Sequence, residues 1–415
     1  MGPLPPSSDA SGKALPRAFS VFWAGQGLSA LGDAMTVVAL PLVVLAQTGS
    51  VADMGRLTAF ARTGGLLATA LAGFVVDRLR PRRVMLACDL FRCALMGLIP
   101  LALLVELRAP WLVFVVGVGA ALAQGIFYVG HVSLVAEIVG RVRVSLANSR
   151  IEGTIALSFV FGPLAAGALS ARFGPATVLG VDAATFFVSA LTLLSMGRGD
   201  APALETPAPQ PRATWTTGFE FIRGQPELAR LSILVALYQL CTAAVVDLFI
   251  FRLKHQLGQG DSGVGLTFAV ASAAAVAAAT LTPRLRAKLS FHRLWSGALV
   301  LQGLALAATA ASHSWVSLAA AAAIYMSVMT TLTICHASVR QELTPQHLLG
   351  RVTSAFVVLV TLPAPMGALA ATALAERFGP GPVQAGTGVG LLMTAACAAF
   401  IWSRSRSRSP TTGSS

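Results

Sequence analysis

The sequence predicts an all-α integral membrane protein in which twelve transmembrane helices form two six-helix bundles. Of its 415 residues, 55% are hydrophobic and only 11% are charged, whereas a soluble domain has about 25% charged residues. Such a chain cannot cover itself with a polar surface in water. Apolar runs of about 20 residues, the length that spans a bilayer as a helix, recur along the chain. Basic residues gather in alternate loops between them.

Twelve runs have the length and composition of a membrane span. The first six lie near residues 20–46, 54–76, 83–105, 110–138, 146–170 and 176–197, and the second six near 229–251, 262–284, 291–311, 314–338, 352–375 and 382–402. The first run is longer than the apolar region of a signal peptide, which has about 7–15 residues. We therefore expect it to stay in the membrane as the first helix.

The basic residues predict the orientation of these spans. Twenty-two of the 30 Lys and Arg residues fall on the side that holds both termini, five fall on the opposite side and three lie within spans. Cytoplasmic loops of membrane proteins carry the excess of Lys and Arg. We therefore expect a multi-pass protein of the inner (plasma) membrane with both termini in the cytoplasm. The same distribution explains the net charge of +13, so we expect no nucleic-acid partner.

A polar interval divides the chain near its middle. Residues 198–227 contain Pro202, Pro207, Pro209 and Pro211, which is typical of a flexible linker. This cytoplasmic linker separates a first bundle at 19–197 from a second at 228–402. A cytoplasmic tail at 1–18 and a basic cytoplasmic tail at 403–415 flank the bundles. Within the linker region, residues 220–228 are expected to form a short surface helix.

The loop between the second and third spans carries a charged motif, Gly73-Phe-Val-Val-Asp77-Arg78-Leu-Arg80-Pro-Arg82-Arg83. It resembles the loop signature of the major facilitator superfamily of transporters, whose two halves are structural repeats. The resemblance implies a conformational latch, in which Asp77 reaches the start of the eleventh span while the carrier faces outward. The latch residues would be Gly73, Asp77, Arg78, Arg82, Arg83 and Arg351. The alternative is a topology determinant with local ion pairs.

The motif departs from the family pattern at two places. Arg80 and Pro81 stand where many members have Gly-Arg. The equivalent turn after the eighth span, from Thr282 to Arg286, lacks the acid. Only one copy of the latch is therefore expected.

Two further motifs resemble efflux carriers. The start of the first span, from Phe22 to Asp33, is similar to the bacterial efflux group that includes the enterobactin exporter and macrolide efflux carriers. In the fifth span, Gly162, Pro163 and Gly167 belong to a stretch that resembles the antiporter signature of exporters, with Ser and Ala in place of two of its glycines. Small residues and a proline allow close packing and a bend at a helix interface. Both resemblances favour export over uptake.

Asp33 is the candidate proton-coupling residue, and the alternative is that it forms a structural ion pair. An ionisable group near the middle of a span costs about 2.5–3.5 kcal/mol and usually faces a cavity or a partner. Desolvation disfavours the charged form of a carboxylate, so such a group can bind a proton, and Glu152 is a second candidate. Arg62 is the candidate partner for a structural pair, because the two Cα atoms would differ by roughly 7 Å in depth.

Polar residues within the spans are candidates for contact with substrate, although such residues are more often satisfied packing residues. They are Gln124, Tyr128, His131, Tyr238 and Gln239. The five cysteines lie in apolar runs without C-x-x-C spacing, so we expect neither a metal site nor a redox role. Nucleotide-binding and hydrolase motifs do not occur in the sequence. We therefore expect no enzymatic activity and no cofactor.

These observations predict a secondary transporter that works by alternating access. The resemblance implies proton-coupled export of a small amphipathic compound, such as a drug, an antibiotic or a siderophore-like molecule. Two alternatives remain open, namely uptake or uniport of a metabolite and a non-transporting receptor with the same fold. The expected partners are the small-molecule substrate, protons and the lipid bilayer, and no obligate protein partner is inferred.

Overall fold

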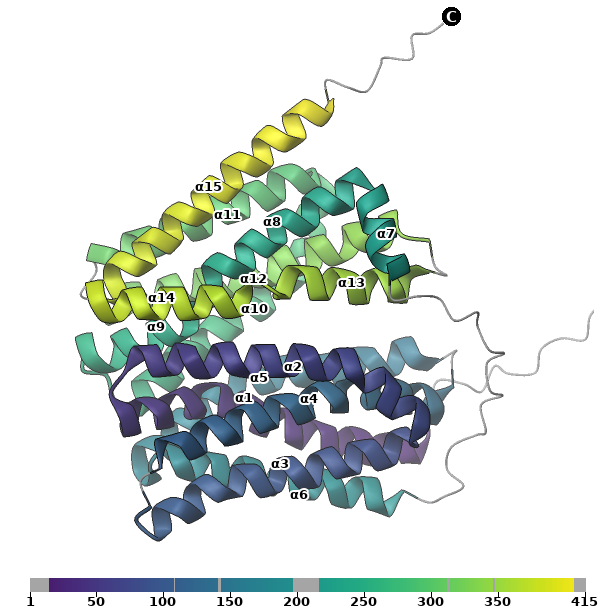
Figure 1. Ribbon diagram of the computed structural model, residues 1–415, viewed down its shortest axis with the longest axis vertical. Coiled ribbons are helices and arrows are strands. Elements are labelled where there is room, and N and C mark those ends of the chain that lie inside the picture. The colour runs from purple at the N-terminus through teal and green to yellow at the C-terminus, as the bar shows by residue number, and fades with distance from the viewer. Residues whose placement is uncertain are drawn as a thin grey trace, which may run out of the picture.

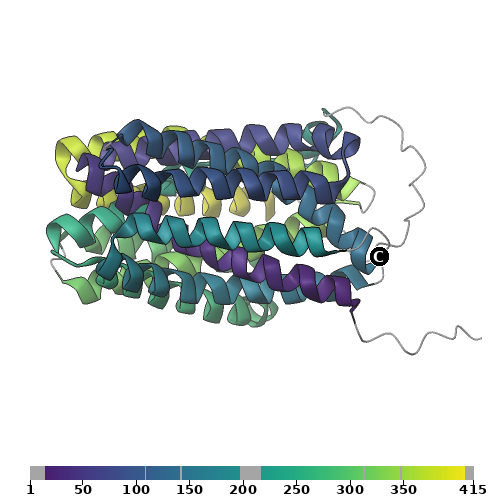
Figure 2. The ribbon, with the colours of Figure 1, turned by 90° about the horizontal axis from the view of Figure 1, so that it is seen from below.

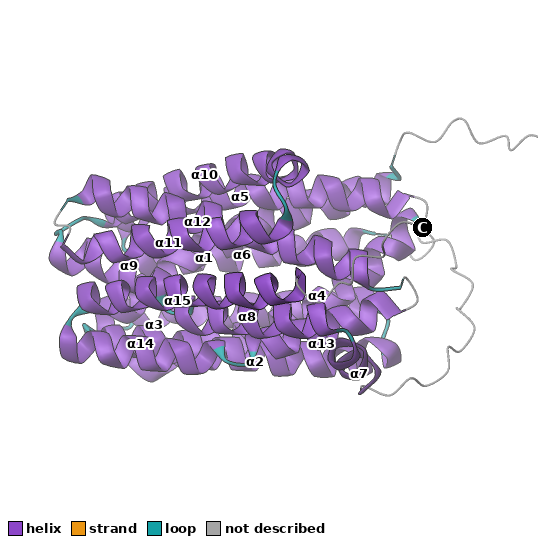
Figure 3. Cartoon of the chain, turned by 90° about the horizontal axis from the view of Figure 1, so that it is seen from above, coloured by secondary structure: helices purple, strands orange, loops and turns teal. Residues whose placement is uncertain are grey.

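The computed structural model describes residues 15–107, 109–140, 143–196, 216–311, 314–345 and 348–406. Within these ranges, the side chains of residues 70, 71, 73–77, 311 and 403–406 are left out of the description. The described part of the chain consists of helices joined by short loops (Figure 3). The all-α prediction is therefore confirmed over these residues.

The first bundle contains six long helices, which occupy the lower half of Figure 1. They are α1 (Arg17–Thr48), α2 (Val51–Arg78), α3 (Pro81–Leu104), α4 (Pro110–Val139), α5 (Val144–Phe173) and α6 (Pro175–Ser195). Three of them begin with proline, whose missing N–H costs nothing at the first helical position. Gly49 ends α1 in the left-handed conformation, with φ 66°, which glycine adopts without steric cost. Sharp turns between antiparallel neighbours follow from these residues.

The second bundle contains the remaining helices, which occupy the upper half of Figure 1. The first are the short helix α7 (Thr216–Gly224), α8 (Pro226–Thr242), α9 (Val245–Phe251) and a π-helical turn η2 (Arg252–Gln256). They are followed by α10 (Asp261–Lys288), α11 (Phe291–Ala308), a 3₁₀ turn η3 (Thr309–Ala311), α12 (Trp315–Leu343), α13 (Leu349–Thr361), α14 (Ala364–Phe378) and α15 (Pro380–Arg406).

Each of the twelve expected spans coincides with a long helix or with a broken pair of helices. Ten of these segments are long and apolar enough to cross a membrane, by length and composition. The other two are α2, which contains Asp53, Arg56 and Arg62, and α11, which has 18 residues and starts close to His292 and Arg293. Both pack within their bundles against strongly apolar neighbours, α2 on α4 and α11 on α12.

Two spans that we expected to be continuous are interrupted. The seventh is divided between α8 and α9, and the eleventh between α13 and α14 at Leu362-Pro363. Proline has no backbone N–H to continue a helical ladder, which explains the second break. The two breaks lie together, because Ala243 and Ala364 belong to one buried cluster with Ala59 of α2. The interruptions of the second bundle therefore face the first bundle.

The short surface helix begins earlier than predicted. It spans Thr216–Gly224, whereas we expected 220–228. Pro226 is the first residue of α8, and the residue before a proline is biased away from helical geometry. The proline therefore separates α7 from α8.

α1 begins at the right-hand end of the molecule in Figure 2, α15 finishes at that same end, and the two bundles meet at the opposite end. Hydrogen bonds join Ser50 to Glu376 at 2.9 Å, Thr58 to Asp247 at 2.9 Å, and Ser170 to Asp261. Ser50 lies in the turn before α2, Thr58 in the starting half of α2, and Ser170 in the final half of α5. We call this region the joined end.

Glycines allow the backbones to approach closely at the joined end. A Cβ atom added to Gly167 of α5 would lie 2.8 Å from the Cα atom of Gly265 in α10 and 2.8 Å from the carbonyl oxygen of Asp261. Backbone atoms cannot move aside as the end of a flexible side chain can. Any side chain at this position must therefore push α5 and α10 apart.

Replacing Gly167 with leucine is expected to open the joined end. Overpacking costs about 1–3 kcal/mol, which shifts a two-state equilibrium by about 5- to 150-fold. Spin labels on Ala46 and Arg377, two exposed residues near this end, would report the change as a longer distance in pulsed electron resonance. The measurement uses a variant whose native cysteines have been replaced.

Gly153→Leu provides the matched control, because Gly153 lies on the same helix and a Cβ atom there meets nothing within 4 Å. Equal distance distributions in the two variants would contradict the close α5–α10 contact.

Candidate functional site

A pocket of about 180 Å³ lies inside the first bundle, between α1, α4 and α5. Its lining runs from Trp23 to Asp33 on α1, from Gln124 to Val132 on α4, and from Asn148 to Ile155 on α5. These stretches belong to the half of the bundle nearer the start of α1. The pocket therefore lies away from the joined end.

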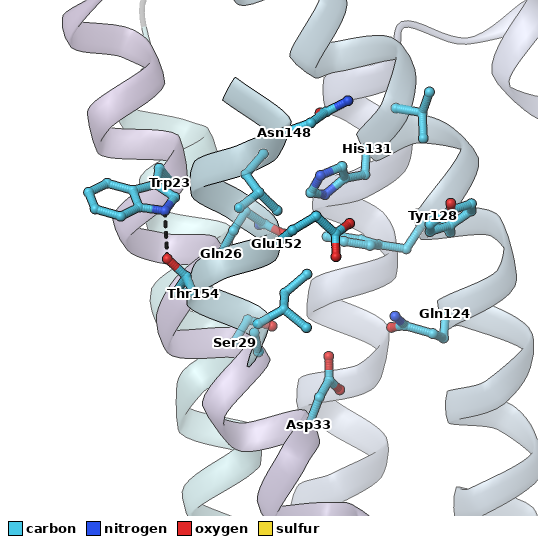
Figure 4. Close-up of a pocket in the computed structure, with 16 residues that line it drawn as sticks. Trp23, Gln26, Ser29, Asp33, Gln124, Tyr128, His131, Asn148, Glu152 and Thr154 are labelled. Atoms are coloured by element: carbon cyan, nitrogen blue, oxygen red, sulfur yellow. Dashed lines mark hydrogen bonds between the residues drawn. The ribbon is translucent and has the colours of Figure 1, made fainter. Parts of the chain in front are cut away.

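Five residues that the sequence singled out line this one pocket. They are Asp33, Gln124, Tyr128, His131 and Glu152. Figure 4 shows the carboxylates of Asp33 and Glu152 and the amide of Gln124 directed into the space between the helices. The structure thus brings together residues that are more than 100 positions apart in the chain.

Other lining residues were not singled out as candidates. Trp23 donates a hydrogen bond from its indole N–H to the Thr154 hydroxyl at 2.9 Å, which joins α1 to α5 (Figure 4). Gln26, one turn further along α1, donates to the Ser189 hydroxyl at 2.9 Å. Trp23 and Gln26 occur within the first-span motif, which could have identified them as candidates. Nothing in the sequence pointed to Asn148 or Thr154.

Arg92 of α3 is the buried cation behind the pocket. Its side chain is 2% exposed, and its guanidinium carbon lies 4.3 Å from the ring centre of Phe127 and 4.1 Å from that of Phe186. One nitrogen donates to Asp89 at 2.6 Å, and another donates to the Gln124 side-chain oxygen. Stacking between rings and charge-assisted hydrogen bonds are favourable for a desolvated guanidinium.

Asp33 pairs with Arg92 and not with Arg62. The Asp33 carboxylate lies 3.7 Å from the nearest Arg92 nitrogen and is 40% exposed. The expected pairing with Arg62 is therefore wrong. Arg62 instead acts electrostatically on Asp247 and Tyr325 of the second bundle. The sequence placed Asp33 and Arg62 at similar depths along the membrane normal. However, α2 directs the face that carries Arg62 towards α9 and α14.

Asp182 of α6 adds a third carboxylate to the surroundings of Arg92. It accepts hydrogen bonds from Thr36 at 2.5 Å and from Thr185 at 3.2 Å. A Cβ atom on Gly32, the residue before Asp33, would collide with the Asp182 carboxylate. Asp89 accepts a further hydrogen bond from Ser189 at 2.7 Å. We call Asp33, Asp89, Asp182 and Arg92 the acidic cluster.

The acidic cluster carries an unbalanced charge when its carboxylates are ionised. Asp33 and Asp89 lie within 4.0 Å of Arg92, the only cation that close to any of the three acids among the described side chains. Asp182 interacts with Arg92 electrostatically. Excess negative charge in a low-dielectric interior is unfavourable. A proton or another cation can relieve it. Of the three carboxylates, Asp33 is the one that lines the pocket.

Tyr238 and Gln239 lie in a different pocket, which is inside the second bundle. Their neighbours there include Trp295, Met329 and His336. Tyr238 is buried, and its hydroxyl accepts a hydrogen bond from Gln302 at 3.3 Å. The structure therefore does not bring these two residues to the pocket that Asp33 lines.

The side chains of two latch candidates, Gly73 and Asp77, lie outside the described residues. Arg82 donates to the carbonyl oxygens of Leu193 at 2.7 Å and Leu194 at 3.0 Å, where α6 ends. Basic side chains near a helix C-terminus satisfy its free carbonyls. Arg82 therefore holds α3 to α6. Of the remaining candidates, Arg78 and Arg83 are exposed.

Arg351, the last latch candidate, lies at the start of α13, where α7 packs. A Cβ atom on Gly218 of α7 would collide with the Arg351 carbonyl oxygen. The backbone of Arg351 is therefore held within the second bundle.

The three residues of the antiporter-like stretch face two different helices. A Cβ atom on Gly162 would lie 2.6 Å from that of Ala34 in α1. The Pro163 carbonyl and Gly167 contact Gly265 of α10. The stretch thus packs α5 against its own bundle and against the other one.

Comparison with known proteins shows clear relatives. The model of the Major Facilitator Superfamily matches residues 22–368. The multidrug efflux pump Tap of Mycolicibacterium fortuitum is 25% identical over 356 residues, which cover 84% of this chain and 87% of the relative. The enterobactin exporter EntS of Escherichia coli is 25% identical over 391 residues, which cover 91% and 89%.

Solved structures share the fold. The nucleoside transporter NupG, as its D323A mutant, has a TM-score of 0.76 and 12% identity, with 93% of this chain and 100% of that chain covered. A bacterial homologue of the lysosomal transporter Spinster has a TM-score of 0.74 and 15% identity, with 93% and 96% covered.

Removal of the Arg92 charge is expected to destabilise the protein. Arg92→Met leaves Asp89 buried without its cation, and breaking one side of a buried ion pair costs about 3–5 kcal/mol. The thermal unfolding midpoint in detergent should fall accordingly.

Arg56→Met is the matched control, because Arg56 pairs with Asp53 at 2.6 Å on the exposed surface, where such pairs contribute about 0–1 kcal/mol. Similar midpoints for the two variants would show that the acidic cluster does not depend on Arg92.

Proposed function

The chain belongs to the major facilitator superfamily, and we propose that it is a proton-coupled exporter of small amphipathic compounds that works by alternating access. Family and relatives indicate a multi-pass membrane transporter rather than an enzyme. The proposal adds the direction of transport, the coupling ion and the class of compound. The observation that carries it is the position of the acidic cluster, with Asp33 exposed at a polar pocket and Asp89 buried behind it.

The arrangement of the bundles supports alternating access. They touch at the joined end, while the pocket lies towards the end that holds the start of α1 and the finish of α15. With both termini in the cytoplasm, as the basic loops indicate, this pocket opens to the cytoplasm. Rocking of the bundles about the pocket, the general mechanism of such folds, would then expose it to the other side.

The acidic cluster supports proton coupling. A proton on Asp33 lowers the negative charge around Arg92, whereas its loss restores the excess. Asp33 is joined to four helices through Arg92, because the contacts of that arginine come from α1, α3, α4 and α6. A change of charge at the pocket therefore acts on the packing of these four helices. Glu152 on α5 is the second candidate site.

Two lines of support favour export. The relatives that match over most of the chain include a multidrug efflux pump and an enterobactin exporter. The antiporter-like stretch also forms part of the joined end, through Gly167.

In the opposite state of the carrier, closure of the other end would bring the last turn of α2 towards the start of α13. There Asp77 and Arg351 would form the latch.

Inside-out vesicles with an acidic interior test this function. Antibiotics, dyes and siderophores are added one at a time, and a pH-sensitive dye follows proton release. We expect compound-dependent release with the unaltered protein and a loss of at least about tenfold with Asp33→Asn, because tenfold corresponds to one lost charge interaction of about 1.4 kcal/mol.

Glu220→Gln is the control variant, since Glu220 is exposed on α7. Proton release that survives Asp33→Asn would move the coupling site, with Glu152→Gln the next variant. Flux of labelled compounds without proton release would contradict proton coupling.

A further inference from the structure

We infer that the pocket is selective for organic cations, so that the exported compounds carry a positive charge on an apolar body. This inference rests on the proposed function, because it names the substrate class of the same pocket. It excludes anionic compounds, including deprotonated siderophores, from the preferred substrates.

The lining of the pocket carries negative charge only. Among the 16 lining residues that the structure describes, Asp33 and Glu152 are acidic, and there is no Lys or Arg. The chain as a whole has 30 Lys and Arg against 17 Asp and Glu. The pocket thus has the opposite sign to the rest of the protein. Burial of an anion beside two carboxylates would be repulsive, whereas a cation would be attracted.

The nearby arginine is not available to an anionic ligand. Arg92 is 2% exposed, lies between the rings of Phe127 and Phe186, and donates to Asp89 and Gln124. Asp33 stands in front of it, at 3.7 Å. Since Asp89 already pairs with Arg92 at 2.6 Å, the carboxylate of Asp33 is only partly compensated and faces the pocket.

The uncharged part of the lining suits the body of such a cation. Trp23, Phe127 and Tyr128 supply aromatic surface, and Gln26 and Asn148 supply amide groups. Tyr128 is 62% exposed, so its ring is accessible from the open side. Aromatic faces attract cations through their quadrupole. Two carboxylates on different helices give the charge two contact points.

A pair of ions with matched shape tests charge selectivity directly. Tetraphenylphosphonium and tetraphenylborate have nearly the same size and surface but opposite charge. Binding of each to the full-length protein in nanodiscs is measured by equilibrium dialysis, with empty nanodiscs as the blank. We expect saturable binding of tetraphenylphosphonium and at least about tenfold weaker binding of tetraphenylborate.

Single variants identify the carboxylates responsible. Glu152→Gln and Asp33→Asn keep the shape of each side chain and remove its charge, and each should weaken tetraphenylphosphonium binding by about tenfold. Glu220→Gln on α7 should not change it. Elution as a single peak in size-exclusion chromatography shows that each variant is folded. Ethidium, a flat aromatic cation, serves as a second probe.

The outcomes separate this inference from the proposed function. Equal binding of tetraphenylphosphonium and tetraphenylborate would overturn cation selectivity. Failure of both tetraphenylphosphonium and ethidium to bind would also overturn it. Proton-coupled flux of a neutral or anionic compound in the vesicles would then leave the proposed function standing. Conversely, charge-selective binding without proton-coupled flux would support the cation site and reject proton-coupled export.

Discussion

The interaction on which the first bundle depends is the burial of the Arg92 guanidinium. A charge in the interior of a membrane protein is tolerated only with nearby partners. Here two aromatic rings cover its faces, while Asp89 and the amide of Gln124 accept its hydrogen bonds. These groups come from α3, α4 and α6, and Asp33 extends the set to α1. The helices are thus held in register by one side chain, and the same side chain sets the charge felt at the pocket.

This arrangement couples the charge at the pocket to a hydrogen-bond network inside the bundle. Ser189 connects Gln26 of the pocket lining to Asp89, by hydrogen bonds of 2.9 Å and 2.7 Å. A neutralising charge near Asp33 therefore affects a network that reaches from the lining to the bundle interior. The network around Arg92 that holds the helices together can thus carry the effect of a bound charge from the pocket to the bundle interior.

Much of the fold was predictable, because membrane spans depend on length and hydropathy. The sequence also indicated Asp33, Glu152, Gln124, Tyr128 and His131, which meet in one pocket. The pairing of Asp33 was not predictable. Depth along a helix can be read from residue spacing, but the rotation of each helix depends on packing with all its neighbours, which turned Arg62 towards the second bundle. The break between α13 and α14 could be predicted from Pro363, whereas no proline lies at the break near Ala243. Tyr238 resembled a cavity residue, yet burial inside its own bundle removed it from the site.

The contact between Gly167 and Gly265 has a consequence for the free energy of closing the joined end. Backbone meets backbone at this contact, so neither residue has a rotamer to select when the bundles come together. Long side chains lose up to about 2 kcal/mol of conformational free energy each when they are ordered, and a glycine loses none from its side chain. Association and separation at this position therefore involve little side-chain entropy. The two bundles can therefore close here without the entropic cost that ordering long side chains would add to each cycle.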